Sequence, residues 1–215
     1  MNRKGLVVLV ALIALAVLAA GNAFAQMPEF KLSAGAGGYF TSDFGGGVKN
    51  STDVLKLPYA GGGGFAFFDA TFAELSFGFF AASGDWHRIS NGNTTSKYDM
   101  SYTGLDISLL GKYPFTLTEQ FTLFPLLGID YRRFVSLKRN GTKISDPPGD
   151  WSALWFKLGA GADYAFTEHI FARLGLLYGI RLANKFEKDW AAYQPNRDTR
   201  LGHGLDVKLA VGYKF

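Results

Sequence analysis

The sequence contains no cysteine. An exported chain without cysteine has no disulfide framework, no cysteine-ligated metal and no lipid-anchored amino-terminal cysteine. Charged residues make up only 19% of the chain and form no long block of one sign, so the sequence lacks the basic footprint of a nucleic-acid-binding protein. After Ala25 no apolar stretch of about 18 residues recurs, which excludes a second hydrophobic helix long enough to span a membrane.

The amino-terminal segment has the three parts of a secretory signal peptide. Arg3 and Lys4 precede an apolar run over residues 6–20, and Ala23-Phe24-Ala25 then forms a cleavage pattern before Gln26. We therefore expect residues 1–25 to be removed, with cleavage determined by Ala23, Ala25 and Gln26, and residues 26–215 to form a single domain. Removal would lower the net charge from +4 to +2, because this segment holds two bases and no acids. The alternative, an uncleaved anchor, fits less well because the apolar run is short for a spanning helix.

Aromatic residues and glycine are abundant in the remaining chain. The whole sequence is 16% aromatic, with 20 phenylalanines and 27 glycines, which excludes a disordered protein. Apolar and polar residues alternate with a period of two, which is typical of strands with one apolar face. The segments with this pattern are residues 29–44, 56–68, 72–82, 98–113, 120–134, 151–165, 170–183 and 205–215.

The connections between these segments alternate in length. The links after the second, fourth and sixth segments are short (DAT, PFTLTE and FTEH), whereas the others are long, polar and rich in turn residues. Short turns at one end and long loops at the other indicate an up-and-down meander. The sequence thus predicts an all-β fold, an up-and-down antiparallel transmembrane β-barrel of about eight strands.

The face opposite the large aliphatic residues is rich in glycine and carries charges of both signs. In a barrel with an apolar exterior these charges point into the interior, whereas a soluble lipocalin-type barrel would point them at solvent. Aromatic residues gather where the apolar faces approach the short turns, as expected at a membrane interface, and this favours the membrane barrel. The predicted interior charges are Glu74, Asp106, Lys112, Asp130, Arg132, Lys157, Asp163, Arg173, Arg181, Asp206 and Lys208.

The carboxyl-terminal stretch LDVKLAVGYKF is an alternating strand that stops on phenylalanine. In this stretch the chain resembles the small eight-stranded outer-membrane barrels, chiefly those of the OmpA/OmpX type and also OmpW-like ones. The resemblance implies an integral outer-membrane location with both termini in the periplasm. It also implies that Val211, Tyr213 and Phe215 form a signal read by the barrel-assembly machinery, with help from periplasmic chaperones. Outer-membrane lipid, including lipopolysaccharide-type headgroups, would surround such a barrel.

Several functions are compatible with this fold. The leading hypothesis is a monomeric structural barrel whose long loops contact a host or envelope protein, with mixed interior charges forming an ion-paired plug. The loops offer Trp86, Phe186, Trp190 and Tyr193, and the bases Lys138, Arg139 and Lys143. The alternative is transport, through a narrow pore or through a lateral gap opened by Pro58, Pro125 and the glycine run 61–64.

An enzyme is the third hypothesis. Asp85, Asp146, Asp150 and Asp189 could gather near His87, as in outer-membrane proteases, but acids in polar loops are ordinary. A histidine and a serine two residues apart on one strand, as in lipid A deacylase barrels, are absent, and no metal-ligand spacing is found. We therefore expect no catalytic activity, no cofactor and no metal.

Overall fold

The computed structural model describes residues 30–44, 47–49, 53–56, 58–90, 93–143, 152–184, 198–200 and 202–215. Residues 31–215 form one compact unit. No helix in the described part of the chain is long and apolar enough to span a membrane. The predicted signal peptide and its cleavage residues Ala23, Ala25 and Gln26 lie outside the described residues.

Eight long strands form the fold, and five short strands accompany them. The long strands are β1 (Leu32–Asp43), β4 (Tyr59–Ala70), β5 (Ala73–Ser90), β6 (Asn93–Lys112), β8 (Phe121–Arg139), β10 (Ser152–Ala165), β11 (Ile170–Asn184) and β13 (Gly202–Lys214). The short strands are β2 (Gly47–Lys49), β3 (Asp53–Lys56), β7 (Phe115–Thr116), β9 (Thr142–Lys143) and β12 (Asp198–Arg200).

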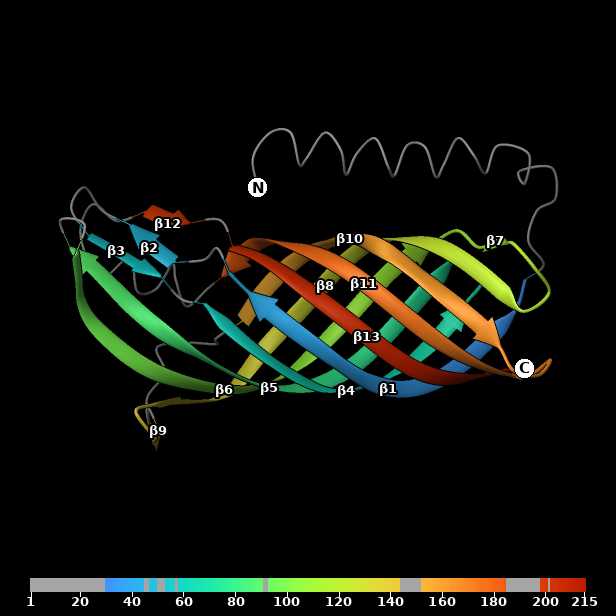
Figure 1. Cartoon of the computed structure of the whole chain (residues 1–215), viewed down its shortest axis with the longest axis horizontal. Coiled ribbons are helices and arrows are strands. Elements are labelled where there is room, and N and C mark those ends of the chain that lie inside the picture. Colours follow the sequence, from blue (N-terminus) through green and yellow to red (C-terminus); the bar gives the residue numbers. More distant parts are fainter. Residues whose placement is uncertain are drawn as a thin grey trace. The chain divides into compact units, whose positions relative to one another are not determined.

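The eight long strands close into a barrel (Figure 1). Each pairs antiparallel with the next long strand along the chain, and β13 pairs with β1 to complete the ring. Closure leaves no unpaired edge along the wall. The predicted fold class and the eight predicted strands are therefore confirmed.

The two ends of the barrel differ. Tight connections join β4 to β5, β6 to β8 and β10 to β11 at one end, here called the short-turn end, where the carboxyl terminus also lies (Figure 1). At the opposite end, here called the hairpin end, β12, β2 and β3 form an extension that pairs onto the end of β5. This asymmetry follows from the alternation of short and long connections in the sequence.

Inward-facing and outward-facing side chains alternate along each strand. On β13, for example, Asp206 and Lys208 are buried inside, whereas Leu209 and Val211 are exposed outside. Because successive side chains leave a strand on opposite faces, one alternating sequence supplies both a polar interior and an apolar exterior. Near the short turns the exterior carries packed aromatic pairs, among them Tyr113 with Phe115, Tyr164 with Phe166 and Tyr213 with Phe215.

Three strands extend further toward the hairpin end than their sequence predicts. Residues 83–97 are a predicted loop, but β5 continues to Ser90 and β6 starts at Asn93, so Trp86 and His87 lie on a strand. Likewise β8 continues past Phe134 to Arg139. Ser83, Thr94 and Lys97 are exposed on this hairpin, whereas Trp86, Met100 and Tyr102 on its inward face are buried.

The residues predicted to open a lateral gap lie within or beside continuous strand pairings. The glycine run 61–64 pairs with β1 on one side and with β5 on the other, without a register shift. Pro125 pairs with Ala160 of β10, and on its other side β6 has already ended at Lys112. The missing N–H of Pro125 therefore falls where the wall changes from β6 to β7, a position that requires no ladder donor.

The carboxyl-terminal residues complete the closure of the barrel. The backbone N–H of Phe215 donates to the Leu32 carbonyl over 3.0 Å, and the N–H of Lys214 donates to the His169 carbonyl over 2.7 Å. The His169 ring also stacks on Tyr213. Val211, Tyr213 and Phe215 all point outward, and Phe215 is 76% exposed. The role of these three residues as an assembly signal stays a prediction.

Candidate functional site

The barrel interior holds the charges singled out in the sequence. All eleven predicted interior charges lie on the inward face; ten are buried as whole residues, and the side chain of Lys112 is only 6% exposed. A buried charge is stable only when it is paired and hydrogen-bonded, so the partners of these groups decide what the interior can do. The partners form separate groups along the barrel.

The first group, the Arg173 cluster, lies toward the short turns and contains Asp69, Glu74, Lys112, Asp163 and Arg173. The Arg173 guanidinium donates to both oxygens of Asp163 over 2.7 Å, to Glu74 over 2.7 Å and to Asp69 over 2.6 Å. Lys112 Nζ donates to the same Asp69 oxygen over 2.5 Å. These five side chains come from β4, β5, β6, β10 and β11, so the cluster ties five strands together.

Three aromatic rings enclose the guanidinium of Arg173. Its central carbon lies 4.8 Å from the ring centre of Phe67, 5.0 Å from that of Phe124 and 5.2 Å from that of Phe171. Such cation–π contacts strengthen when the cation is removed from water. The rings also fill the interior around the ions, which keeps them dry.

Glycine makes room for these rings. A Cβ atom at Gly35, Gly161 or Gly212 would overlap the ring of Phe67, Phe124 or Phe171 respectively. At these three positions the inward glycines therefore accommodate aromatic rings. A small barrel has room for large inward rings only where the opposing residues lack side chains.

Replacing Gly161 with alanine is expected to destabilise the barrel by about 1–3 kcal/mol, the usual cost of overpacking a filled interior. Gly175, its direct cross-strand partner, supplies the matched control. An added Cβ at Gly175 would meet only Lys208 Cβ, at 3.5 Å, so Gly175→Ala should be nearly neutral. The free energy of unfolding, from guanidinium titration in lipid vesicles, would measure both. Equal effects would contradict the assignment of Phe124 to this space.

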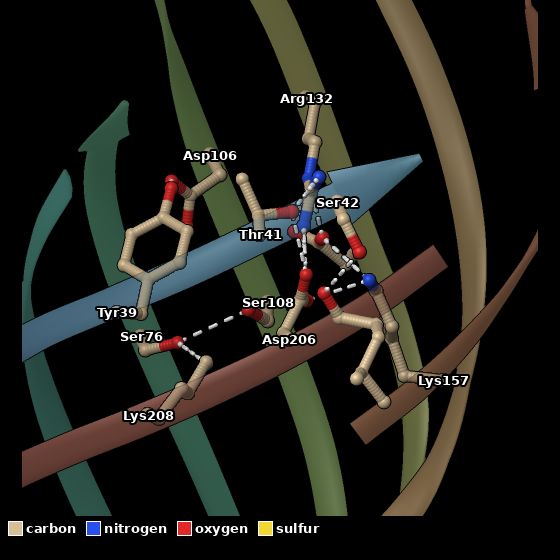
Figure 2. A network of polar contacts seen from close by, with 12 residues as sticks. Tyr39, Thr41, Ser42, Ser76, Asp106, Ser108, Arg132, Lys157, Asp206 and Lys208 are labelled. Atoms are coloured by element: carbon tan, nitrogen blue, oxygen red, sulfur yellow. Dashed lines mark hydrogen bonds and ion pairs between the residues drawn. The ribbon is translucent and has the colours of Figure 1, made fainter. Parts of the chain in front are cut away.

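The second group, the Arg132 cluster, contains Thr41, Asp130, Arg132, Lys157 and Asp206; Figure 2 shows Thr41, Arg132, Lys157 and Asp206 pointing toward one another. Arg132 Nη2 donates to both Asp206 oxygens over 3.0 and 2.9 Å, and Nη1 donates to the Thr41 hydroxyl over 2.8 Å. Arg132 Nε donates to Asp130 over 2.9 Å, and Lys157 Nζ donates to Asp206 over 2.6 Å. Asp206 thus accepts from both cations and, over 2.6 Å, from the Thr41 hydroxyl.

The interior holds two further sets of polar contacts. The Tyr39 hydroxyl donates to Asp106 over 2.5 Å, and the Ser76 and Ser108 hydroxyls are 3.1 Å apart (Figure 2). Lys208 Nζ donates to the Ser76 hydroxyl over 3.4 Å. All five residues are buried, so their polar groups satisfy one another rather than water.

Trp155 contacts both the Arg132 cluster and a third charged group, the ion pair of Arg181 with Asp43, toward the hairpin end. Its ring is fully buried and lies 5.4 Å from the Arg132 guanidinium, 4.9 Å from Lys157 Nζ and 5.5 Å from the Arg181 guanidinium. Arg181 Nη1 donates in turn to Asp43 over 2.6 Å. One indole therefore contacts three cations.

Beyond Trp155 the interior becomes aromatic. A cluster of inward side chains from β4, β5, β6 and β8 fills it: Tyr59, Phe80, Ala82, Trp86, Met100, Tyr102 and Leu137, with Tyr98 and Phe134 packed against them. The Trp86 indole donates to the Tyr102 hydroxyl. Trp86 is therefore an interior residue and not an exposed loop aromatic.

Sequence reasoning missed several interior partners. Asp43 and Asp69 were not among the predicted charges, although both are buried in ion pairs. The inward rings Phe67 and Phe80 were also missed, because each has an outward neighbour, Phe68 or Phe79, that fits an apolar exterior. Glycine could have indicated these inward rings, because each lies beside a glycine on a neighbouring strand. Phe67 lies beside Gly35, and Phe80 lies beside Gly104.

Of the residues in the enzyme hypothesis, only Asp85 and His87 lie in the described part of the chain, two residues apart on β5. The Lys97 ammonium, 2.7 Å from Asp85, lowers the pKa of the Asp85 carboxyl, and the hydrogen bond to Asp85 raises the pKa of Lys97. His203 faces outward, and its Nδ1 lies 2.6 Å from the Tyr178 hydroxyl, whereas Asp206 faces inward. Asp146, Asp150 and Asp189 lie outside the described residues. No group of three or more His, Cys, Asp or Glu side chains suited to a metal occurs among the residues that could be searched.

Comparison with known proteins identifies the family. A family model described as "Outer membrane protein beta-barrel domain" matches residues 10–215. The chain belongs to this family. Its β-barrel is therefore an integral outer-membrane barrel, and the exposed aliphatic residues of its wall face lipid. A comparison of the sequence with curated proteins gives no match.

Solved outer-membrane proteins resemble this outer-membrane barrel. OprG from Pseudomonas aeruginosa is 16% identical with a TM-score of 0.47, over 88% of this chain and 97% of that one. Neisserial surface protein A is 10% identical with a TM-score of 0.46, over 86% and 97%. The attachment invasion locus protein Ail of Yersinia pestis, solved with the heparin analogue sucrose octasulfate, is 13% identical with a TM-score of 0.39, over 88% and 100%.

Proposed function

We propose that this protein is a non-enzymatic, structural barrel with a closed interior, and that its long hairpin end contacts envelope or host surfaces. One observation carries the proposal: hydrogen bonds cross the interior between opposite strands. In the ring order β1, β4, β5, β6, β8, β10, β11, β13, strand β11 is opposite β5 and strand β8 is opposite β1. The bonds from Arg173 to Glu74 and from Arg132 to Thr41 join these opposite strands.

The crossing bonds of Arg173 and Arg132, together with the aromatic rings packed against both guanidinium groups, favour a plug over a conduit. Conduction would require the paired ions to separate inside a narrow tube, where an unpaired charge is costly. The interior of an eight-stranded barrel is only wide enough to be filled by side chains. The continuous pairing beside the glycine run 61–64 supports the same proposal, because it leaves the predicted lateral route without an opening there.

The hairpin end supplies the surface for contacts. The strands β5, β6 and β8 have 18, 20 and 19 residues, whereas about 9–11 residues cross a membrane, so their ends project beyond the bilayer. Lys97, Lys138, Arg139 and Lys143 are exposed there. The predicted loop aromatics Phe186, Trp190 and Tyr193 lie outside the described residues.

Ion conductance in a planar bilayer tests the closed interior. We expect no discrete openings from the folded barrel, and none after residues 185–197 are shortened, because the crossing bonds belong to the barrel itself. Heat-modifiable electrophoretic mobility would establish folding in both preparations. Reproducible openings of the unaltered protein would contradict the proposal and favour a pore. Openings only after shortening would place the block in that loop, not in the ion clusters.

Assembly is proposed separately. In line with the family resemblance, Val211, Tyr213 and Phe215 would be read by the barrel-assembly machinery before the strand β13 closes on β1. The hydrogen bonds of Lys214 to His169, just before β11, and of Phe215 to Leu32 of β1 support this, since the same residues complete the ring.

A further inference from the structure

The outward face of β8 changes from apolar to basic toward the hairpin end. Leu127, Ile129 and Tyr131 are exposed on the lipid-facing side of the wall. The next outward residue, Arg133, is also exposed; it pairs with Leu105 of β6 on one side and with Ser152 of β10 on the other. Arg133 therefore marks the level at which the exterior turns from apolar to polar, where lipid headgroups begin.

Beyond Arg133 a bulge keeps the following bases on the outer face. Gly104 pairs with Phe134 and Thr103 pairs with Ser136, so Val135 is the extra residue. After the bulge, Lys138 lies directly opposite Ser101, which is exposed, while the adjacent pair of Leu137 and Tyr102 is buried inside. Lys138 consequently points outward on the same side as the lipid-facing residues.

A tight turn then returns the chain so that a second lysine faces the first. Asn140 and Gly141 both have positive φ, 48° and 79°, as in the two-residue turns that best match hairpin twist. Lys138 and Lys143 are direct cross-strand partners on β8 and β9. Directly opposed side chains have Cβ atoms about 4.5–5.5 Å apart, and like charges at that spacing repel each other.

An anion between the two ammonium groups would relieve their repulsion. Both lysines are exposed and neither has an ion-pair partner in the described part of the chain. A lysine on the neighbouring hairpin, Lys97, is by contrast paired with Asp85 over 2.7 Å. A phosphate group between two ammonium groups forms charge-assisted hydrogen bonds to both. We infer that Lys138 and Lys143 bind a phosphate group of an outer-leaflet lipid.

The inference goes beyond the proposed function and rests on the outer-membrane location and on the orientation that the family resemblance implies, with the hairpin end facing outward. Lipid is favoured over a soluble phosphate compound because the bases continue the lipid-facing surface of one strand, β8, and stand immediately beyond its apolar part. A headgroup anchored in the adjacent leaflet is held at that height, which raises its local concentration at the two lysines.

The test compares two probes that differ only in phosphate. The protein is placed in zwitterionic phosphatidylcholine nanodiscs containing either bis-phosphorylated lipid A or the same lipid without phosphates, and retained lipid is counted by native mass spectrometry. We expect about a tenfold preference for the phosphorylated lipid, equivalent to about 1.4 kcal/mol. Equal retention of the two lipids by the unaltered protein overturns the inference and needs no variant.

Variants locate the site. K138S/K143S should lose most of the preference, whereas K97S, which removes a lysine already paired with Asp85, should keep it. K138R/K143R should retain the preference because it keeps both cations. Loss of preference in K97S to the same degree would mean general attraction to a basic protein end and would overturn the assignment, as would retention in K138S/K143S. Heat-modifiable mobility confirms that each variant is folded.

Discussion

Replacing Arg173 with alanine is expected to lower the free energy of unfolding by about 3–5 kcal/mol, the usual cost of removing one partner of a buried ion pair. The variant leaves Asp69, Glu74 and Asp163 buried, with Lys112 as the remaining cation of the cluster. It also opens a void between three aromatic rings. The effect should therefore exceed that of any single exposed charge.

Guanidinium unfolding in lipid vesicles would measure this loss. Arg173→Lys is the informative companion, because it keeps the charge but cannot bond three carboxylates with a planar fork. We expect Arg173→Lys to fall between the unaltered protein and Arg173→Ala. Arg139, exposed at the hairpin end, provides the control, and its alanine variant should change stability by less than about 1 kcal/mol. A stable Arg173→Ala barrel would mean that the cluster does not hold the wall together.

Replacing Ile107 with arginine is expected to cost about 2–3 kcal/mol, because the guanidinium would face lipid hydrocarbon between the midplane and the headgroups. Ile107 is exposed on the outer face of β6 between Leu105 and Leu109, also exposed, so it lies within the apolar part of that strand. The same unfolding measurement in vesicles detects the loss.

The control for this variant is an arginine at a different depth in the bilayer. Thr103 is on the same face of β6, four residues toward the hairpin end, which is about 13 Å along a strand. Thr103→Arg should cost only about 0–1 kcal/mol, since the cost of an arginine falls toward the interface. Equal costs at the two positions would contradict the placement of the bilayer around β6.

The sequence alone predicted the facing of most strand residues, although it missed inward side chains such as Asp69 and Phe67. Alternation with a period of two is a local property of an extended chain, so it can be read without knowing how strands pair. Asp206 inside and Leu209 outside on β13 follow from it directly. The number of strands and the up-and-down order follow equally from the segment pattern and from connection lengths.

Strand ends at the hairpin end were less predictable. Residues 83–97 read as a loop because serine, glycine and asparagine are frequent in them, yet β5 and β6 continue because their hydrogen bonds to each other compensate for weak strand propensity. Similarly, only the positive φ angles of Asn140 and Gly141 and the resulting register bring Lys138 opposite Lys143.

The sequence by itself determined the barrel class, the two faces and most of the charges that the interior holds. Only the tertiary structure decided how those charges pair and which aromatic rings separate them. Arg173 bonds Asp69, 104 residues away, and Thr41 bonds Asp206, 165 residues away. Such pairs depend on the closure and stagger of the whole barrel, which set the height at which each inward side chain meets its partner. Alternation along a strand determines whether a side chain faces inward or outward, but no local sequence pattern determines its height along the barrel.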